Sequence, residues 1–393
     1  MKDRLLHTPE GVRDIYNDEC ERKKELMRRI EDTFHSCGYR DIETPTMEYF
    51  DVFGYEIGTI PSRELFKFFD REGDTMVLRP DFTPSIARAC SKYFMEEGKP
   101  IRLCYQGSTF VNHSSLQGRL RESTQMGVEL IGEESVDADA EVIAMVIDSL
   151  LGAGLQDFQI TLGHAGFFAA LSQDAGLDEE TAGALRDLIK NRNVFGVEKM
   201  LQSQDLPADT RDILSAIPNL FGDGQMLLSV LEQTKSPKAA RAVSRLIEVW
   251  KILQLYGVSR YVSFDLGMMS NYKYYTGIIF RGYTYAAGEP IVKGGRYDRL
   301  LSFFGKDAPA IGFVIVTDTL LEAMTRQHID IPVSGKKILI RYSEEKREEA
   351  IRQAKERRKR GERVTLSVCG KDINAASETE NNTASYDEIC CFM

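Results

Sequence analysis

The chain has 393 residues, and its 42% hydrophobic and 28% charged residues exclude a wholly disordered or fibrous protein. The net charge of −10 disfavours general binding to nucleic acid, because such binding depends on Lys and Arg side chains that neutralise phosphates. No apolar stretch approaches the roughly 20 residues of a membrane span, and the N-terminus lacks the apolar region of a signal peptide. We therefore expect a soluble, cytoplasmic protein of about two to three domains.

The seven cysteines and five histidines indicate neither a disulfide framework nor a metal site. The number of cysteines is odd and no C-x-x-C pair occurs, which is typical of free thiols in a reducing compartment. No two histidines have the spacing of metal ligands. We expect no metal and no other cofactor.

The first part of the chain alternates between predicted helices and strands. Residues 18–37 have the apolar period of an amphipathic helix, and Gly38 supplies its end. Residues 139–151 predict a second helix that packs on a sheet. Short apolar runs predict the strands of that sheet, which should be largely antiparallel, at 76–78, 101–105, 126–132 and 158–163.

Residues 165–257 have helical periodicity throughout, including the segment 210–222, and nothing in them alternates as a strand does. Strand patterns then return at 261–267, 277–285 and 311–316. The simplest interpretation is a single α+β core over residues 1–330, whose sheet is interrupted by a helical insertion and then completed.

A small β-α-β domain is predicted after Pro332, over residues 335–393. It contains a strand at 336–342, a helix at 343–362, a strand at 363–368 and a final strand at 388–393. Residues 336–363 hold 12 basic and 6 acidic side chains. We favour a solvated helix with i,i+4 ion pairs, and contacts with RNA or with a partner protein are the open alternatives.

Several motifs occur in a fixed order along most of the chain, and together they resemble the histidyl-tRNA synthetase family. The resemblance covers residues 7 to about 325 and implies the class II synthetase fold, an antiparallel sheet with flanking helices. It also implies a homodimer formed through the region around Ile42–Phe50. The motifs are HTPEGVRD (7–14), IETPTMEYFDVF (42–53), LRPDFTPSIAR (78–88), YQGSTFVNHSSLQGRLRESTQMGVELIG (105–132), DLGMMSNYKYYTGIIF (265–280), GGRYDRL (294–300) and PAIGFVIVTDTL (309–320).

Three arginines that handle phosphate in the resembled family are missing here. Val111, Ser270 and Thr319 stand at the matching positions, and Lys273 lies three residues beyond the second of them. A cation that stabilises transition-state charge contributes roughly 10²–10³ in rate, so the loss of all three should abolish adenylation.

The amino-acid side of the resembled site is retained. The resemblance implies that a carboxylate grips an α-amino group while tyrosine and glutamate hydrogen-bond an imidazole, which suits free histidine as an effector. Each residue also has a purely structural interpretation: a turn or cap for Asp81, a buried polar pair for Gln125 and Glu129, and core packing for one tyrosine. Gly294, Gly295 and Arg296 likewise fit a tight turn and an ion pair. The implied histidine-binding residues are Asp81, Thr83, Gln125, Glu129, Tyr274 and Tyr275.

The C-terminal segment of about 60 residues is shorter than the synthetase anticodon-binding domain, and a full anticodon module is therefore not expected. These departures resemble the family of ATP phosphoribosyltransferase regulatory subunits. That resemblance implies a non-catalytic partner of a short-form catalytic subunit in a hetero-octamer, required for the first step of histidine biosynthesis and for feedback by histidine. The alternatives are an active histidyl-tRNA synthetase, which the missing arginines oppose, and a tRNA-related paralogue.

Overall fold

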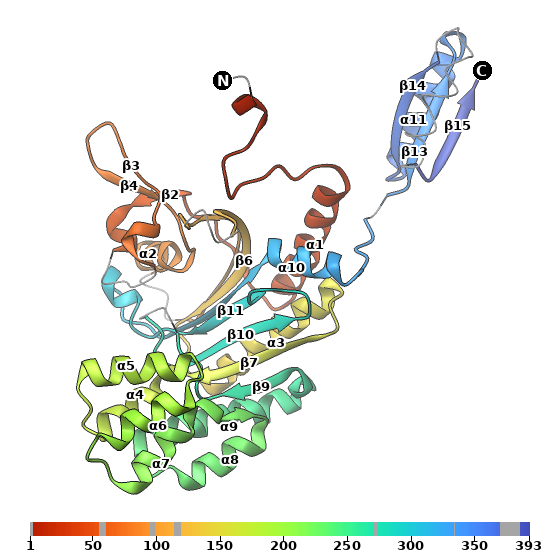
Figure 1. Ribbon diagram of the computed structural model, residues 1–393. Coiled ribbons are helices and arrows are strands. Elements are labelled where there is room, and N and C mark those ends of the chain that lie inside the picture. Colours follow the sequence, from red (N-terminus) through yellow and green to blue (C-terminus); the bar gives the residue numbers. More distant parts are fainter. Residues whose placement is uncertain are drawn as a thin grey trace. The chain divides into compact units, whose positions relative to one another are not determined.

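The computed structural model describes residues 3–54, 60–94, 99–113, 119–270, 274–333, 335–369 and 386–393 (Figure 1). The chain divides into two compact units, Met1–Ile331 and Pro332–Met393. Within the described ranges, no helix combines the length and apolar character needed to cross a membrane.

Helix α1 (Asn17–Ser36) confirms the first predicted helix. Leu26, Ile30 and Phe34 recur every four residues and are buried, because this spacing keeps them on one face of the helix. The helix ends just before Gly38, whose φ of 82° lies in the left-handed region that favours glycine.

A nine-stranded sheet in the order β1-β5-β6-β12-β11-β10-β7-β9-β8 forms the centre of the first unit. The pairs β1–β5 and β7–β9 are parallel and the remaining pairs are antiparallel, which confirms the expected α+β class with a largely antiparallel sheet. The strands are β1 (Arg40–Asp41), β5 (Ile101–Phe110), β6 (Glu122–Ile131), β7 (Phe158–His164), β8 (Phe221–Gly222), β9 (Val262–Asp265), β10 (Ile278–Thr284), β11 (Val292–Arg296) and β12 (Ala310–Val316).

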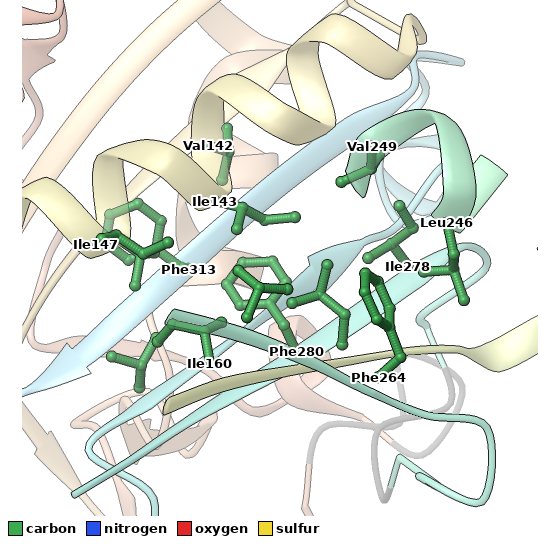
Figure 2. Packing of buried hydrophobic residues seen from close by; sticks show 14 of the residues in the cluster. Val142, Ile143, Ile147, Ile160, Leu246, Val249, Phe264, Ile278, Phe280 and Phe313 are labelled. Atoms are coloured by element: carbon green, nitrogen blue, oxygen red, sulfur yellow. The ribbon is translucent and has the colours of Figure 1, made fainter. Parts of the chain in front are cut away.

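One face of this sheet is covered by helices α3 (Val136–Ala153) and α9 (Pro237–Leu255) (Figure 2). Phe280 and Phe313 project from the strands toward Ile143 of α3, and Leu246 of α9 closes the same layer. All four side chains are at most 2% exposed. Helices α1 and α10 (Thr317–Arg326) contribute to the same core. The main core therefore lies on this face. A second apolar cluster lies on the opposite face, where Ile101 and Leu103 of β5 pack with Ile86 of helix α2 (Thr83–Tyr93).

The predicted helical insertion is present as a run of helices between β7 and β9 (Figure 1). Its helices begin at residues whose side chains accept backbone N–H groups, such as Asp178, Asn193, Asp223 and Ser236. The helices are α4 (Ala165–Asp174), α5 (Glu179–Lys190), α6 (Val194–Gln202), α7 (Ala208–Ala216), α8 (Gly224–Gln233) and α9.

Three local predictions differ from the structure. The strand expected at 76–78 is β4 (Thr75–Leu78), which pairs with β2 (Met47–Tyr49) and β3 (Lys67–Phe69) in a separate three-stranded sheet. The segment 210–222 is not helical to its end, because Phe221–Gly222 pairs with β9 as β8. Strand β11 was not predicted, because its two adjacent glycines mask the apolar alternation.

The second unit contains β13 (Lys337–Tyr342), α11 (Arg347–Lys359), β14 (Arg363–Val368) and β15 (Glu388–Phe392). Its sheet has the order β14-β13-β15, with both pairs parallel. Ala350 and Ala354 of α11 pack against Ile338 and Ile340 of the central strand. Their small side chains bring the helix close to the sheet, while its basic residues are mostly exposed.

An ion-pair network fastens α3 to the sheet. Asp139 on α3 is fully buried, and its carboxylate accepts hydrogen bonds from Nε of Arg296 at 2.8 Å and from Nε of Arg245 at 2.6 Å. Arg296 belongs to the GGRYD motif, so the ion pair foreseen for this motif is present, whereas the tight turn is not: its glycines lie within strand β11.

We predict that Asp139→Ala lowers the free energy of unfolding by about 3–5 kcal/mol, because it removes the buried counter-ion of Arg296. Among the described carboxylates, this leaves the buried guanidinium only the longer ion pair with the partly exposed Asp298. Urea unfolding followed by circular dichroism measures the change. Asp137→Ala is the matched control, since Asp137 is exposed in the same first turn of α3 and should cost less than about 1 kcal/mol. Equal losses for the two variants would contradict the buried network as a source of stability.

Candidate functional site

The segment between β4 and α2 (Thr83–Tyr93) is held in place by Arg79. The guanidinium of this buried residue donates to the carbonyl oxygens of Thr44 at 2.7 Å and Ser108 at 2.9 Å. It also lies 4.0 Å from the centroid of the Phe82 ring. Arg79, two residues before Asp81, is therefore fixed by contacts with Thr44, Ser108 and Phe82.

Thr83 links this loop to strand β6. Its hydroxyl donates to Oε1 of Glu129 at 2.7 Å, and its backbone N–H donates to Oδ1 of Asp81 at 3.3 Å. The bond from the Thr83 N–H to Asp81 fits the structural interpretation of Asp81 as a turn or cap residue. The same aspartate still has its other oxygen, Oδ2, directed toward the hydroxyl of Tyr274 at 3.4 Å.

Glu129 is a buried carboxyl group with two hydroxyl partners. Its side chain is 1% exposed, and it accepts hydrogen bonds from Thr83 and from the hydroxyl of Tyr297. Burial raises the pKa of Glu129 to about 8, although the two hydroxyl donors act in the opposite direction. At neutral pH this group is therefore mostly protonated.

The tyrosines form one wall around the two carboxyl groups. The ring centroids of Tyr274 and Tyr275 are 4.7 Å apart, and Tyr274 meets Tyr297 edge-on at 5.7 Å. Tyr274 is buried and packs in an apolar cluster with Phe82, whereas Tyr275 is half-buried. The expectation that one of the pair serves core packing is thus met by Tyr274, which also reaches Asp81.

Glycines on the neighbouring strands make room for these side chains. The register places Gly312 of β12 opposite Glu129, and Gly295 of β11 opposite Gly312. A Cβ atom on Gly312 would collide with the Glu129 carboxyl group, and one on Gly295 would lie 2.7 Å from the Tyr275 ring. The sheet is therefore shaped so that an acid and an aromatic ring can lie flat against it.

We call Asp81, Thr83, Glu129, Tyr274, Tyr275 and Tyr297 the acidic cluster. The structure brings together five of the six predicted binding residues, and Gln125 is the exception. Gln125 lies on the same face of β6 as Glu129, but four residues along a strand is about 13 Å. It is half-buried and flanks the cluster without joining its hydrogen bonds.

Two residues of this site were missed by the sequence reasoning. Tyr297 lies within the GGRYD motif, and its hydroxyl closes the contact with Glu129. Lys293 precedes the motif; burial lowers its pKa, and its positive charge lowers the pKa of Asp81, which burial raises. The pairing of β11 with β12 could have revealed both, had β11 been recognised as a strand.

The three positions without arginine lie at the ends of elements around the sheet. Val111 follows β5, Ser270 follows β9 and its turn, and Thr319 is in the first turn of α10. Lys273 lies outside the described residues.

A lysine does reach the start of α10. Nζ of Lys23 lies 2.6 Å from Oδ1 of Asp318, whose Oδ2 accepts the backbone N–H of Thr124 at 2.6 Å. This cation is therefore already neutralised by the protein itself.

Comparison with known proteins assigns the family. The family model described as histidyl-tRNA synthetase matches residues 11–320. A curated relative from Acetivibrio thermocellus, named ATP phosphoribosyltransferase regulatory subunit, is 39% identical over 99% of this chain and 92% of its own. A relative of the same name from Caldanaerobacter subterraneus subsp. tengcongensis is 37% identical over 98% of this chain and 99% of its own.

The chain belongs to the family of ATP phosphoribosyltransferase regulatory subunits. Its C-terminal unit agrees, because residues 339–393 match the model described as histidyl-tRNA synthetase HisZ, C-terminal domain.

Solved structures of this family and of the synthetases share the fold. An ATP phosphoribosyltransferase regulatory subunit/histidyl-tRNA synthetase from Bacillus halodurans aligns with a TM-score of 0.88 and 33% identity over 99% of this chain and 98% of its own. A histidyl-tRNA synthetase from Nostoc sp. PCC 7120 aligns with a TM-score of 0.80 at 18% identity, over 96% and 90% of the two chains. The second match supports the class II fold alone.

The raised pKa of Glu129 predicts a pH-dependent stability. Between its ordinary value of 4.5 and about 8, the native state binds a proton that the unfolded state has lost, so the free energy of unfolding should fall as the pH rises. The slope is at most about 1.4 kcal/mol per pH unit. Glu129→Gln mimics the protonated acid and should remove this dependence.

Urea unfolding of both proteins at about pH 6 and about pH 8 tests the prediction, with the stability gain of the variant expected only at the higher pH. Glu122→Gln, at the exposed start of the same strand, is the control and should show no such difference. If the free energy of unfolding of the wild type does not fall relative to that of Glu129→Gln between the two pH values, the carboxyl group is ionised in the folded state.

Proposed function

We propose that this chain is the non-catalytic regulatory subunit that activates a separate, short-form catalytic subunit of ATP phosphoribosyltransferase, the enzyme of the first step of histidine biosynthesis. The observation that carries the proposal is the match to relatives of that name, which extends over nearly the whole of this chain and of the relatives. It includes the C-terminal unit, where an anticodon-binding domain would otherwise be expected.

The absence of synthetase chemistry is the second part of the proposal. Amino-acid activation requires cations around the α-phosphate, where negative charge grows in the transition state. Val111 and Thr319 cannot supply that charge, and Lys23 is paired with Asp318, the residue before Thr319. We infer that the retained fold serves binding and assembly.

Free histidine is the proposed ligand of the acidic cluster. Its ammonium group needs an anion, and Asp81 has an oxygen directed toward the tyrosine wall. An imidazole ring suits the aromatic faces of Tyr274 and Tyr275, and Glu129 offers a carboxyl group that can either donate or accept a proton. Lys293 is the matching cation for the carboxylate of the ligand.

Feedback regulation then follows from linkage. If histidine binding favours one state of the complex with the catalytic subunit, the binding of that subunit must change the affinity for histidine by the same factor. We propose that this coupling operates in a hetero-octamer, in which dimers of this chain assemble with the catalytic subunits.

Activation of the catalytic subunit is the direct test. We predict that the two chains co-purify and that the catalytic chain forms phosphoribosyl-ATP only in the presence of this one. The same preparation should show no histidine-dependent ATP–pyrophosphate exchange above a control without enzyme. Exchange activity would favour the synthetase alternative, and a catalytic subunit that is fully active alone would contradict the regulatory role.

We predict that Asp81→Asn weakens histidine binding about 10- to 150-fold, because a charge-assisted hydrogen bond contributes roughly 1.5–3 kcal/mol. Isothermal titration calorimetry on the chain alone and in the complex measures the change. Asp74→Asn, in the exposed turn between β3 and β4, is the control and should leave the affinity unaltered. Unchanged affinity and feedback in Asp81→Asn would place the effector site elsewhere.

A homodimer is proposed through the edge strand β2. Met47 and Tyr49 project from this strand and are 55% and 56% exposed, although large apolar side chains in a row are normally covered. Among the described residues, strand β2 pairs with β4 alone and is an edge strand, so its other edge could meet a second copy.

We predict that the isolated chain is a dimer with about twice its mass of 44.4 kDa, and that the double variant Met47→Glu, Tyr49→Glu is a monomer. Light scattering at micromolar concentration distinguishes the two. Phe69→Glu is the control, because Phe69 is 73% exposed on β3, the opposite edge strand of the same sheet. A wild-type mass near that of a single chain would contradict the prediction.

A further inference from the structure

A group of metal-ligating side chains lies where the end of α1 meets the edge of the large sheet. Glu31 and His35 are four residues apart on α1, a spacing that places them on one face of the helix. Asp41 in β1 and Cys104 in β5 are register partners across the parallel edge pair. Four side chains with donor atoms thus come from three elements.

Three of these side chains already converge on one point. Nε2 of His35 lies 3.1 Å from both carboxylate oxygens of Asp41, and Sγ of Cys104 lies 3.4 Å from Oδ1 of Asp41. The nitrogen, oxygen and sulfur atoms all lie within 4.8 Å of one another. In a tetrahedral site with bonds of about 2.0–2.3 Å, ligand atoms are about 3.3–3.8 Å apart, so small adjustments would enclose a cation.

The surrounding structure holds these groups in place. Asp41 and Cys104 are fixed by the ladder between β1 and β5, and α1 is anchored by Ile30 and Phe34 in the main core. Cys104 is 1% exposed and forms the floor, whereas His35 and Asp41 are exposed and leave the outer side open. A cation could enter from solvent without any rearrangement of the backbone.

Glu31 is the candidate for a fourth ligand. Its Oε1 accepts a hydrogen bond at 3.2 Å from the side chain of Gln106, which lies two residues beyond Cys104 on the same face of β5. Glu31 thus lies one turn of α1 before His35 and contacts β5, and it joins the three convergent groups only through a change in its side-chain rotamer.

We propose that Glu31, His35, Asp41 and Cys104 form a binding site for a divalent transition metal of the Zn²⁺ type, which fastens the end of α1 to the sheet edge. Thiolate and imidazole ligands select Zn²⁺ and related ions over Mg²⁺ and Ca²⁺, which prefer oxygen alone. The thiol of Cys104 would release its proton on binding, and neutral His35 would bind through Nε2. Sequence spacing does not predict this site, because its ligands are distributed over residues 31–104.

Cobalt substitution tests the proposal directly. The full-length chain, treated with a chelator and kept reduced, is titrated with Co²⁺, and thiolate ligation gives a charge-transfer band in the near ultraviolet. We expect one Co²⁺ per chain, displacement by Zn²⁺ but not by Mg²⁺, and loss of the band in Cys104→Ser. Cys37→Ser is the matched control, since Cys37 is the cap of the same helix and is not part of the site.

His35→Gln is the second variant, because His35 is exposed and its replacement should not disturb folding. Its affinity for Zn²⁺, measured by competition with a chromophoric chelator, should fall at least tenfold. The increase in melting temperature that Zn²⁺ gives the wild type should disappear with it. No cobalt band in the wild type, a band that survives Cys104→Ser, or a band that requires Cys37 would each overturn the proposal.

Discussion

The buried carboxyl group of Glu129 is the constraint around which the site is arranged. A carboxyl group at 1% exposure in the middle of a sheet is costly unless its oxygens are hydrogen-bonded, and here a threonine and a tyrosine supply those bonds. The space for it exists because the next two strands carry Gly312 and Gly295 at the same level. Any side chain at either glycine would displace the acid or the tyrosine ring beside it.

The main elements of the fold could be predicted because local patterns specify them. Helix α1 was recognisable from its apolar spacing and from the glycine that ends it. Strand β11 was missed because its adjacent glycines erase the alternation that identifies a strand. Gly295 makes room for Tyr275 of the site, and Gly294 makes room for Phe280 of the main core. The small sheet β2-β4-β3 was also missed, because the separation of two sheets depends on long-range packing and not on the pattern of either strand.

The residues of the site also divide into those that the sequence predicted and those that only the structure shows. Asp81, Glu129 and the tyrosine pair were found through their motifs, and the structure brings them into one cluster. Gln125 shares a motif with Glu129, yet strand geometry carries it away from the hydrogen-bonded group. The role of Tyr297 could not be read from its motif, since the contact joins residues 168 positions apart. The group formed by His35, Asp41 and Cys104 could not be predicted from the sequence either, because only the strand register brings Asp41 to Cys104.

Arg79 gives the site a mechanical property. Its guanidinium is bound to the backbone at Thr44, just before strand β2, and its own backbone N–H donates to the carbonyl oxygen of Thr46. The same side chain stacks on Phe82, the residue next to Asp81. The hydrogen bonds and ring stacking of Arg79 thus connect the edge of the small sheet to the loop that contains Asp81, so a displacement of either is transmitted to the other. A protein that paired with strand β2 at this edge would therefore be connected to the carboxylate of Asp81 through the contacts of Arg79.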